Sequence, residues 1–144
     1  MNNTILVGID GSETSRRAAE FAASVAKSKD LPLVVAYVIE WSAFTFNTPQ
    51  ENEERHMRRE EEITTAREKV LNPMLHALEK EGVKVSGIVR HGQVADVLIQ
   101  IGKEKNADQL VLGRIGQSKI KTMIFGSVAA KLVQLSDIPI TIVP

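Results

Sequence analysis

Apolar runs alternate with amphipathic segments along most of this chain. Residues 5–9 and 31–39 are apolar almost throughout, which is typical of strands buried on both faces of a parallel sheet. Residues 83–90 and 138–143 instead place apolar and polar residues in alternation, the period of a strand with one exposed face. Together with a shorter apolar run at residues 109–112, the pattern predicts five strands, with the two alternating ones at the sheet edges.

Between these runs, apolar residues recur every three or four positions, as on a helix that buries one face. Such segments lie within residues 18–26, 63–78, 94–101 and 128–133. The charge-rich stretch from Glu51 to Glu81 predicts one long amphipathic helix. Because proline has no N–H and its ring crowds the preceding turn, Pro73 predicts a kink or a break near Asn72.

The predicted strands and helices alternate regularly, and this order defines the fold class. A β-α-β-α-β-α-β-α-β chain favours an α/β fold with a parallel sheet, right-handed crossovers and helices on both faces. The strands near residues 5 and 110 are expected to be neighbours, with a topological switch point between them. Ligands of such sheets bind at that point, beyond the carboxyl ends of the strands, where Asp10 and Gly113 lie.

A glycine-bearing stretch joins the fourth predicted strand to the last helix. Gly113 and Gly116 are followed, after nine residues, by Gly126, and Ser127 opens the helix. The first amides of a helix have no intrahelical acceptor and carry partial positive charge, so this arrangement predicts a phosphate cradle. The alternative is that the glycines serve only turn geometry. Between positions 109 and 136 there are four basic residues and no acidic one, which favours a small anion.

Length and charge narrow the class of function. The chain has 144 residues without a change in composition, which predicts one domain over residues 1–144. Its 18 basic and 18 acidic residues give no net charge, so neither nucleic acid nor a membrane surface is expected as a partner. No apolar run approaches the ~20 residues of a spanning helix, and the first residues do not have the pattern expected of a signal sequence. The absence of cysteine fits a reducing compartment, and we expect a cytoplasmic location.

The glycine stretch also carries a resemblance to a known family. Its pattern, Gly113-x2-Gly116-x9-Gly126-Ser127, is similar to the ATP-binding signature of the universal stress proteins. Residues 7–12 resemble their first strand and the Asp that follows it, and the resemblance spans essentially the whole chain. It implies a Rossmann-like five-stranded parallel sheet in the order 3-2-1-4-5. It further implies bound ATP, or AMP or ADP, with Mg²⁺ as an additional possibility.

Four residues carry over from this resemblance to the ribose and the base. Gly8, Ile9 and Asp10 would flank them, and Val38 would meet adenine through its backbone. Asp10 has an alternative role, which is to shape or cap the turn before the first helix, where Ser12 is a second capping residue. Asp10 is therefore a candidate for ribose or Mg²⁺ binding and for a purely structural role.

The resemblance implies that the phosphates follow the glycine stretch. Its residues on this path are Leu112, Gly113, Arg114, Gly116, Gly126, Ser127 and Val128. Two positions depart from the family's pattern. Arg114 stands with Ile115 where a small or polar pair is common, and it is a phosphate partner or a solvated loop charge. Ala129 stands where ATP-binding members usually carry Ser or Thr, which removes one hydroxyl donor.

The last strand suggests an oligomer. An apolar alternating edge with free backbone groups is an aggregation hazard unless it is covered. Antiparallel pairing with a second copy about a two-fold axis would cover it. The family resemblance implies the same arrangement, a homodimer joined through residues 138–143.

Three functions remain open from the sequence. The favoured one is a nucleotide-binding stress or regulatory dimer. The second is slow ATP hydrolysis, for which Asp10 is the only evident general base and no P-loop is present. The third is a dimer that binds no nucleotide, which Ala129 keeps open. The three histidines show no ligand spacing, so they predict no metal site, and only His91 lies at the carboxyl end of a predicted strand.

Overall fold

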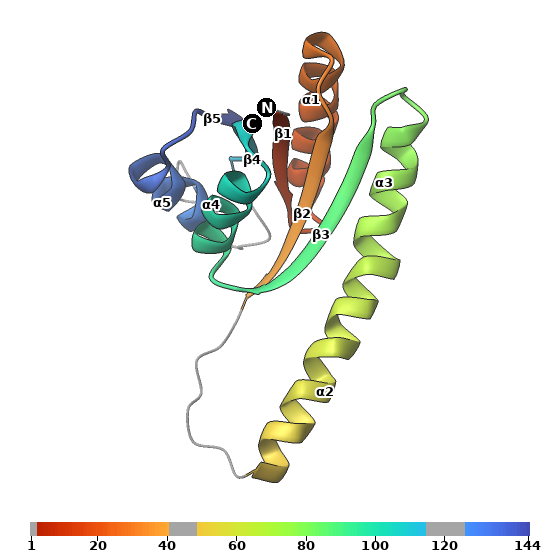
Figure 1. Cartoon of the computed structure of the whole chain (residues 1–144), viewed down its shortest axis with the longest axis vertical. Helices are drawn as coiled ribbons and strands as arrows, with labels where there is room; N and C mark the ends of the chain where they lie inside the picture. The colour runs from red at the N-terminus through yellow and green to blue at the C-terminus, as the bar shows by residue number, and fades with distance from the viewer. Residues whose placement is uncertain (1–2, 41–48, 115–125) are drawn as a thin grey trace.

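Five parallel strands form one sheet in the order β3-β2-β1-β4-β5 (Figure 1). The computed structural model describes residues 3–40, 49–114 and 126–144. The strands are β1 Thr4–Ile9, β2 Leu33–Glu40, β3 Val85–Gly92, β4 Ala107–Gly113 and β5 Ile140–Val143. The predicted α/β class, the strand order and the pairing of the first strand with the fourth are confirmed.

Helices cover both faces of this sheet, as predicted. They are α1 Glu13–Lys29, α2 Pro49–Ala66, the π-helical turn η1 Arg67–Leu71, α3 Asn72–Glu79, α4 Val94–Glu104 and α5 Ser127–Leu135. α1 and the α2–η1–α3 helix lie on one face, and α4 and α5 on the other (Figure 1). In β1, Ile5 and Val7 pack under α1 whereas Leu6 packs under α4, and all three are fully buried. A central strand therefore needs apolar residues at every position.

The two alternating segments do form the sheet edges. β3 and β5 each pair with a single neighbour within the described sheet. Pro139 directly precedes β5, and its carbonyl accepts the amide of Leu110 over 2.9 Å, so proline still supplies an acceptor where the strand begins. At the other edge, Arg90 of β3 forms a 2.6 Å ion pair with Glu104 of α4. This hydrogen bond holds the pKa of the Glu104 carboxyl below its ordinary value.

The long charged helix is continuous, and Pro73 does not break it. The five residues before Asn72 form the π-helical turn, and the Asn72 amide donates to the carbonyl of Arg67, five residues back. The backbone at both ends of this turn, at Ala66 and Asn72, stays in the right-handed helical region. A prolyl ring crowds the carbonyl four residues before it and leaves it without a donor. In the structure one turn before Pro73 is widened into a π-bulge, the single-turn form in which π-helix usually occurs inside an α-helix.

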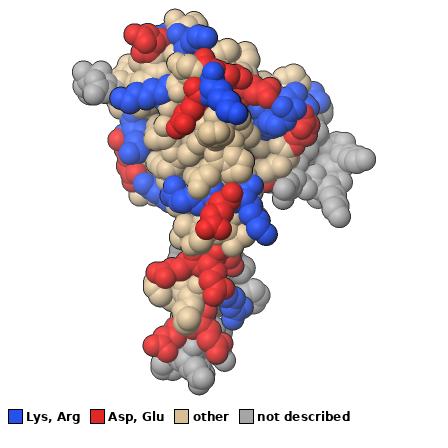
Figure 2. Space-filling view, turned by 90° about the vertical axis from the view of Figure 1, so that its right-hand side faces the viewer, with Lys and Arg blue, Asp and Glu red and all other residues tan. Residues whose placement is uncertain are grey.

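Only the second half of this helix packs on the sheet. Ala66, Leu71 and Leu78 are buried against it, whereas Met57 is 63% exposed. The first half extends well beyond the strands (Figure 1), and Figure 2 shows it as a narrow projection carrying acidic and basic side chains. Helical stability in proteins comes mainly from packing of an apolar face, so the second half anchors the whole helix.

This division predicts unequal effects of two truncations. Replacing Leu78 by Ala leaves a cavity under the helix and should lower the free energy of unfolding by about 2–5 kcal/mol. Met57→Ala removes a side chain from solvent and should change it by about 0.5 kcal/mol or less. Urea denaturation followed by circular dichroism measures both. Equal losses would show that the projecting half is also part of the cooperative core.

Candidate functional site

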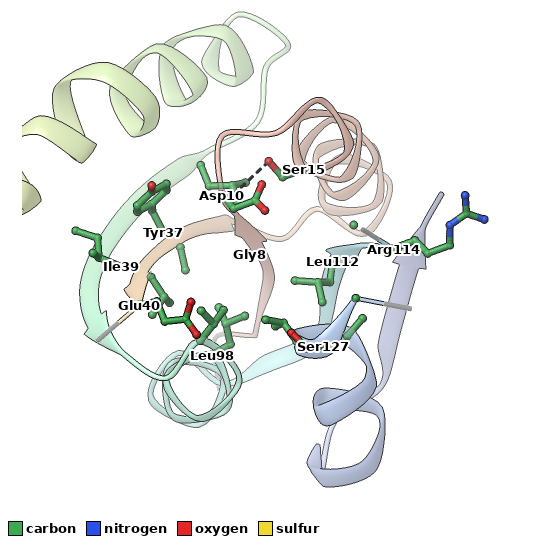
Figure 3. A pocket seen from close by; sticks show the side chains of 18 residues that line it. Gly8, Asp10, Ser15, Tyr37, Ile39, Glu40, Leu98, Leu112, Arg114 and Ser127 are labelled. Carbon is green, nitrogen blue, oxygen red and sulfur yellow. Dashed lines mark hydrogen bonds between the residues drawn. The ribbon is translucent and has the colours of Figure 1, made fainter. Parts of the chain in front are cut away.

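A pocket opens at the carboxyl ends of β1, β2 and β4, between α4 and α5 (Figure 3). Its volume is about 390 Å³, within the range of small-molecule sites in proteins. β1 lies between β2 and β4 in the sheet, so the pocket sits where the connections change direction. The sequence predicts a ligand at this place, and the chain is hollowed there.

The structure brings ten of the eleven predicted site residues together in the wall of this pocket. They are Gly8, Ile9, Asp10, Val38, Leu112, Gly113, Arg114, Gly126, Ser127 and Val128. Gly116 lies outside the described residues. Sequence reasoning did not single out Glu40 of β2, Val94 and Leu98 of α4, or Ser15 of α1, which also line the pocket. The strand period offered a signal for Glu40, because it lies two residues after Val38.

Asp10 shapes the turn between β1 and α1. Its Oδ1 atom accepts the amide of Ser12 over 2.9 Å, and its own amide donates to Ser15 Oγ over 3.3 Å. Ser12 in turn caps α1, because its Oγ accepts the amide of Ser15 over 3.1 Å. Asp10 also lies in the pocket wall (Figure 3). Asp10 therefore does have the structural role that the sequence left open, and it also lines the pocket.

The start of α5 has no such side-chain cap. Gly126 is its N-cap residue, without a side chain, and the first backbone bond of the helix runs from the Ala130 amide to the Gly126 carbonyl over 3.0 Å. The amide of Gly126 itself donates to the Arg114 carbonyl over 2.8 Å. The next three amides, at positions 127–129, belong to the first turn, where a helix supplies no acceptor. This turn therefore presents N–H groups and the positive end of the dipole to the pocket.

Arg114 contributes its backbone and not its charge to the pocket. Its amide donates to the Val143 carbonyl over 2.8 Å, and its carbonyl accepts from Gly126. The guanidinium points away from the pocket, past β5 (Figure 3). In this arrangement Arg114 fixes the path of the chain out of β4. Arg114 was predicted to be either a phosphate partner or a solvated loop charge, and the orientation of its side chain favours the second role.

On the other side of β1, the backbone of β2 runs past its neighbour. Ile9 is the last β1 residue in the ladder and pairs with Tyr37, whereas β2 continues to Glu40. The Ile5 amide donates to the carbonyl of residue 32, and backbone groups alternate between the two neighbours of a parallel strand, so the Val38 carbonyl faces the β1 side. No β1 residue of the described sheet pairs with it there. This leaves a backbone acceptor at the pocket, beside the apolar side chains of α4.

The walls beside this acceptor are apolar and tightly packed. Leu98 is 1% exposed and Val38 is 9% exposed. A Cβ atom built on Gly8 would lie 3.0 Å from Leu98 Cδ1 and 3.2 Å from Leu112 Cδ1, so glycine keeps the pocket floor flat. Glycine is required at position 113 for a different reason. A Cβ on Gly113 would lie 2.8 Å from Thr14 Cγ2 and 3.3 Å from the Thr14 backbone. The first glycine of the signature thus serves the close approach of β4 and α1.

The histidine that the sequence places at the carboxyl end of a strand, His91, lies away from the pocket. His91 Nε2 is 2.9 Å from Glu62 Oε2 of α2, and it does not line the pocket. Within residues 3–40, 49–114 and 126–144, no three His, Asp or Glu side chains are grouped so that they could hold a metal ion. None of the helices in these ranges has the length and apolar character needed to cross a membrane.

Known proteins are similar to this chain over nearly its whole length. Residues 1–144 match the model of the universal stress protein family. The universal stress protein YxiE of Bacillus subtilis is 30% identical over 152 residues, and 99% of each chain is covered. The structure of UspA from Lactobacillus plantarum is similar with a TM-score of 0.84 at 17% identity, over 100% of this chain and 99% of that one. The universal stress protein of Archaeoglobus fulgidus in complex with dAMP gives a TM-score of 0.66 at 19% identity, over 99% and 98%.

The contrast between the two helix starts predicts different costs for two serine substitutions. Ser12→Ala removes the hydroxyl that caps α1 and should lower the free energy of unfolding by about 1 kcal/mol. Ser127 follows the N-cap position of α5 and caps nothing there, so Ser127→Ala should change it by about 0.5 kcal/mol or less. Urea denaturation of both variants tests this. A larger loss for Ser127→Ala would contradict the assignment of Gly126 as the N-cap.

Proposed function

Because the chain belongs to the universal stress protein family, we propose that it binds an adenine nucleotide in the pocket between α4 and α5. One observation carries the proposal: the N-cap residue of α5, Gly126, has no side chain to cap the helix, and this helix start opens onto the same cavity as the apolar wall of β2 and α4. The first feature suits phosphate and the second suits a base. The A. fulgidus relative, which is solved with dAMP, supports an adenine ligand.

The residues present fit such a ligand along its length. The amides of Ser127 and Val128 would hold phosphate, in the way helix N-termini bind anions. Asp10 would accept a hydrogen bond from the ribose hydroxyls. Val38 and Leu98 would enclose the base, and the Val38 carbonyl would accept one of its N–H groups. ATP, ADP and AMP share all of these groups, and Mg²⁺ would accompany the longer phosphate chains.

We propose that this protein acts in the cytoplasm in the response to stress, and that nucleotide binding regulates it. The acidic residues in the described part of the pocket wall are Asp10 and Glu40, and the Oδ1 atom of Asp10 already accepts from the Ser12 amide. A group committed to holding a turn is a poor general base, because turnover requires it to take and release a proton. Occupancy of the pocket, rather than hydrolysis, is therefore the proposed signal.

We further propose that the protein is a homodimer joined through β5. The carbonyl of Pro139 accepts the Leu110 amide of β4 and that of Val143 accepts the amide of Arg114, directly after β4, so the backbone groups of the even-numbered residues, Ile140 and Ile142, point away from the sheet. Val133 and Leu135, on the helix that leads into β5, are 58% and 51% exposed. Antiparallel pairing of two copies of β5 would satisfy the outward groups and close both edges.

The nucleotide proposal predicts a ligand that depends on Gly126. Acid release from freshly purified protein, followed by ion-exchange chromatography against standards, should give an adenine nucleotide at close to one per chain. Gly126→Val places a branched side chain where phosphate approaches the α5 amides, and we expect affinity to fall at least ~100-fold while the fold persists.

The fold of this variant is checked by circular dichroism, with Met57→Val on the projecting helix as the matched control for nucleotide affinity. Unchanged affinity in Gly126→Val would remove the phosphate assignment. Absence of nucleotide, with no binding of added MgATP or AMP, would favour the dimer without a ligand. Conversion of ATP at a rate that falls in Asp10→Ala would instead establish the hydrolase.

The dimer proposal predicts that a proline and an alanine at one position behave differently. Ile142→Pro removes the outward amide and should give a monomer by light scattering at micromolar concentration. Ile142→Ala removes more of the side chain than the proline does but keeps the amide, so it should remain dimeric. A monomeric wild type, or a dimeric Ile142→Pro, would contradict pairing through β5.

A further inference from the structure

Glu40 is a carboxylate at the mouth of the pocket, on a strand that is otherwise apolar. It is the last residue of β2 and lines the pocket together with Val38. Side chains two residues apart share one face of a strand, so Ala36, Val38 and Glu40 all face the α4 side of the sheet. Ala36 and Val38 belong to the core under α4. Figure 3 accordingly shows the Glu40 side chain on the same side of the pocket as Leu98 of α4.

The carboxylate is available to a ligand. Glu40 is exposed at the pocket mouth, and no hydrogen bond or ion pair of its side chain occurs within the part of the chain that the structure describes. A strand that ends here could carry any polar residue that favours solvent. Glu40, however, lies on the face of β2 that lines the pocket, where its carboxylate can contact a bound ligand.

Charge fixes which end of a nucleotide Glu40 meets. Phosphates are repelled by a carboxylate and attracted by the first turn of α5. α5 follows β4, whereas Glu40 ends β2, and β1 lies between these two strands. A nucleotide therefore enters with its phosphates on the β4 side and its base on the β2 side, between Val38 and Leu98.

We infer that Glu40 is a specificity residue, which accepts a hydrogen bond from the exocyclic amine of adenine. This inference rests on the nucleotide binding proposed above. The amine has two hydrogens, and a backbone carbonyl at Val38 can accept only one of them in a single geometry. A carboxylate is an acceptor only, and its hydrogen bonds are stronger than those of neutral oxygens. A purine without an N–H at this position leaves Glu40 without a partner, so the site selects the amino form.

A thermodynamic cycle, which combines a substitution at Glu40 with the removal of the amine from the ligand, isolates this contact. Affinities for AMP and for purine riboside 5′-monophosphate, which carries hydrogen in place of the amine, are measured by isothermal titration calorimetry on protein freed of nucleotide by dialysis. The wild type should favour AMP by at least about tenfold, because the analogue loses the hydrogen bonds to both the Glu40 carboxylate and the Val38 carbonyl. Glu40→Met has similar length and no strong acceptor, and should reduce this preference about fivefold. Glu40→Gln, which keeps a neutral acceptor, should lie between them.

The outcomes separate this inference from the nucleotide proposal. Glu79→Gln alters an exposed carboxylate of α3 outside the pocket, and it should keep the wild-type preference. An undiminished preference in Glu40→Met, or equal affinities of the wild type for both ligands, would overturn the role of Glu40 while nucleotide binding stands. A wild type that binds neither ligand would overturn both proposals.

Discussion

The pocket depends on one constraint, which is that all five strands run in the same direction and end at the same side of the sheet. Where one strand outlasts its neighbour at that side, its last backbone groups have no partner in the ladder. β2 outruns β1 there, and thirteen residues separate Gly113, the last residue of β4, from Ser127, the first residue of α5. An acceptor at Val38 and the donors of α5 are therefore produced by the ladder itself. The side chains refine a site that the backbone already defines.

The two helix starts at this side show how sequence assigns different roles to similar geometry. α1 and α5 each follow a strand that borders the pocket. Ser12 satisfies the first turn of α1 with its own hydroxyl, whereas Gly126 brings no side chain to α5. Capping residues stabilise a helix by the same bonds that an anion would form. A capped helix start is thus closed to phosphate, and an uncapped one that faces a cavity is available to it.

Much of this could be predicted because it rests on periodicity. The apolar runs and the alternating edges identified the strands, and the switch point placed Asp10 and Gly113 at one pocket. What could not be predicted depends on three-dimensional contacts. A proline in a helical pattern does not reveal whether the chain bends or widens one turn, because packing on the sheet decides it. Sequence also cannot show that the Arg114 side chain points outward, since the neighbouring β5 sets its direction. Glu40 was missed because a charge at a strand end is usually only solvated.

The chain carries no net charge, yet the ligand proposed for its pocket is an anion, and the arrangement of the pocket wall is compatible with both. In the described part of its wall, the ionisable side chains are Asp10, Glu40, Tyr37 and Arg114, and the arginine points away. Within the described residues, the groups that attract phosphate are backbone dipoles, which do not appear in a count of charged residues. Fixed dipoles act over about one helical turn, so they hold an anion at one place without attracting polyanions from a distance. A carboxylate on the far side of β1 strengthens this discrimination, because it excludes phosphate from the end of the pocket that suits a base.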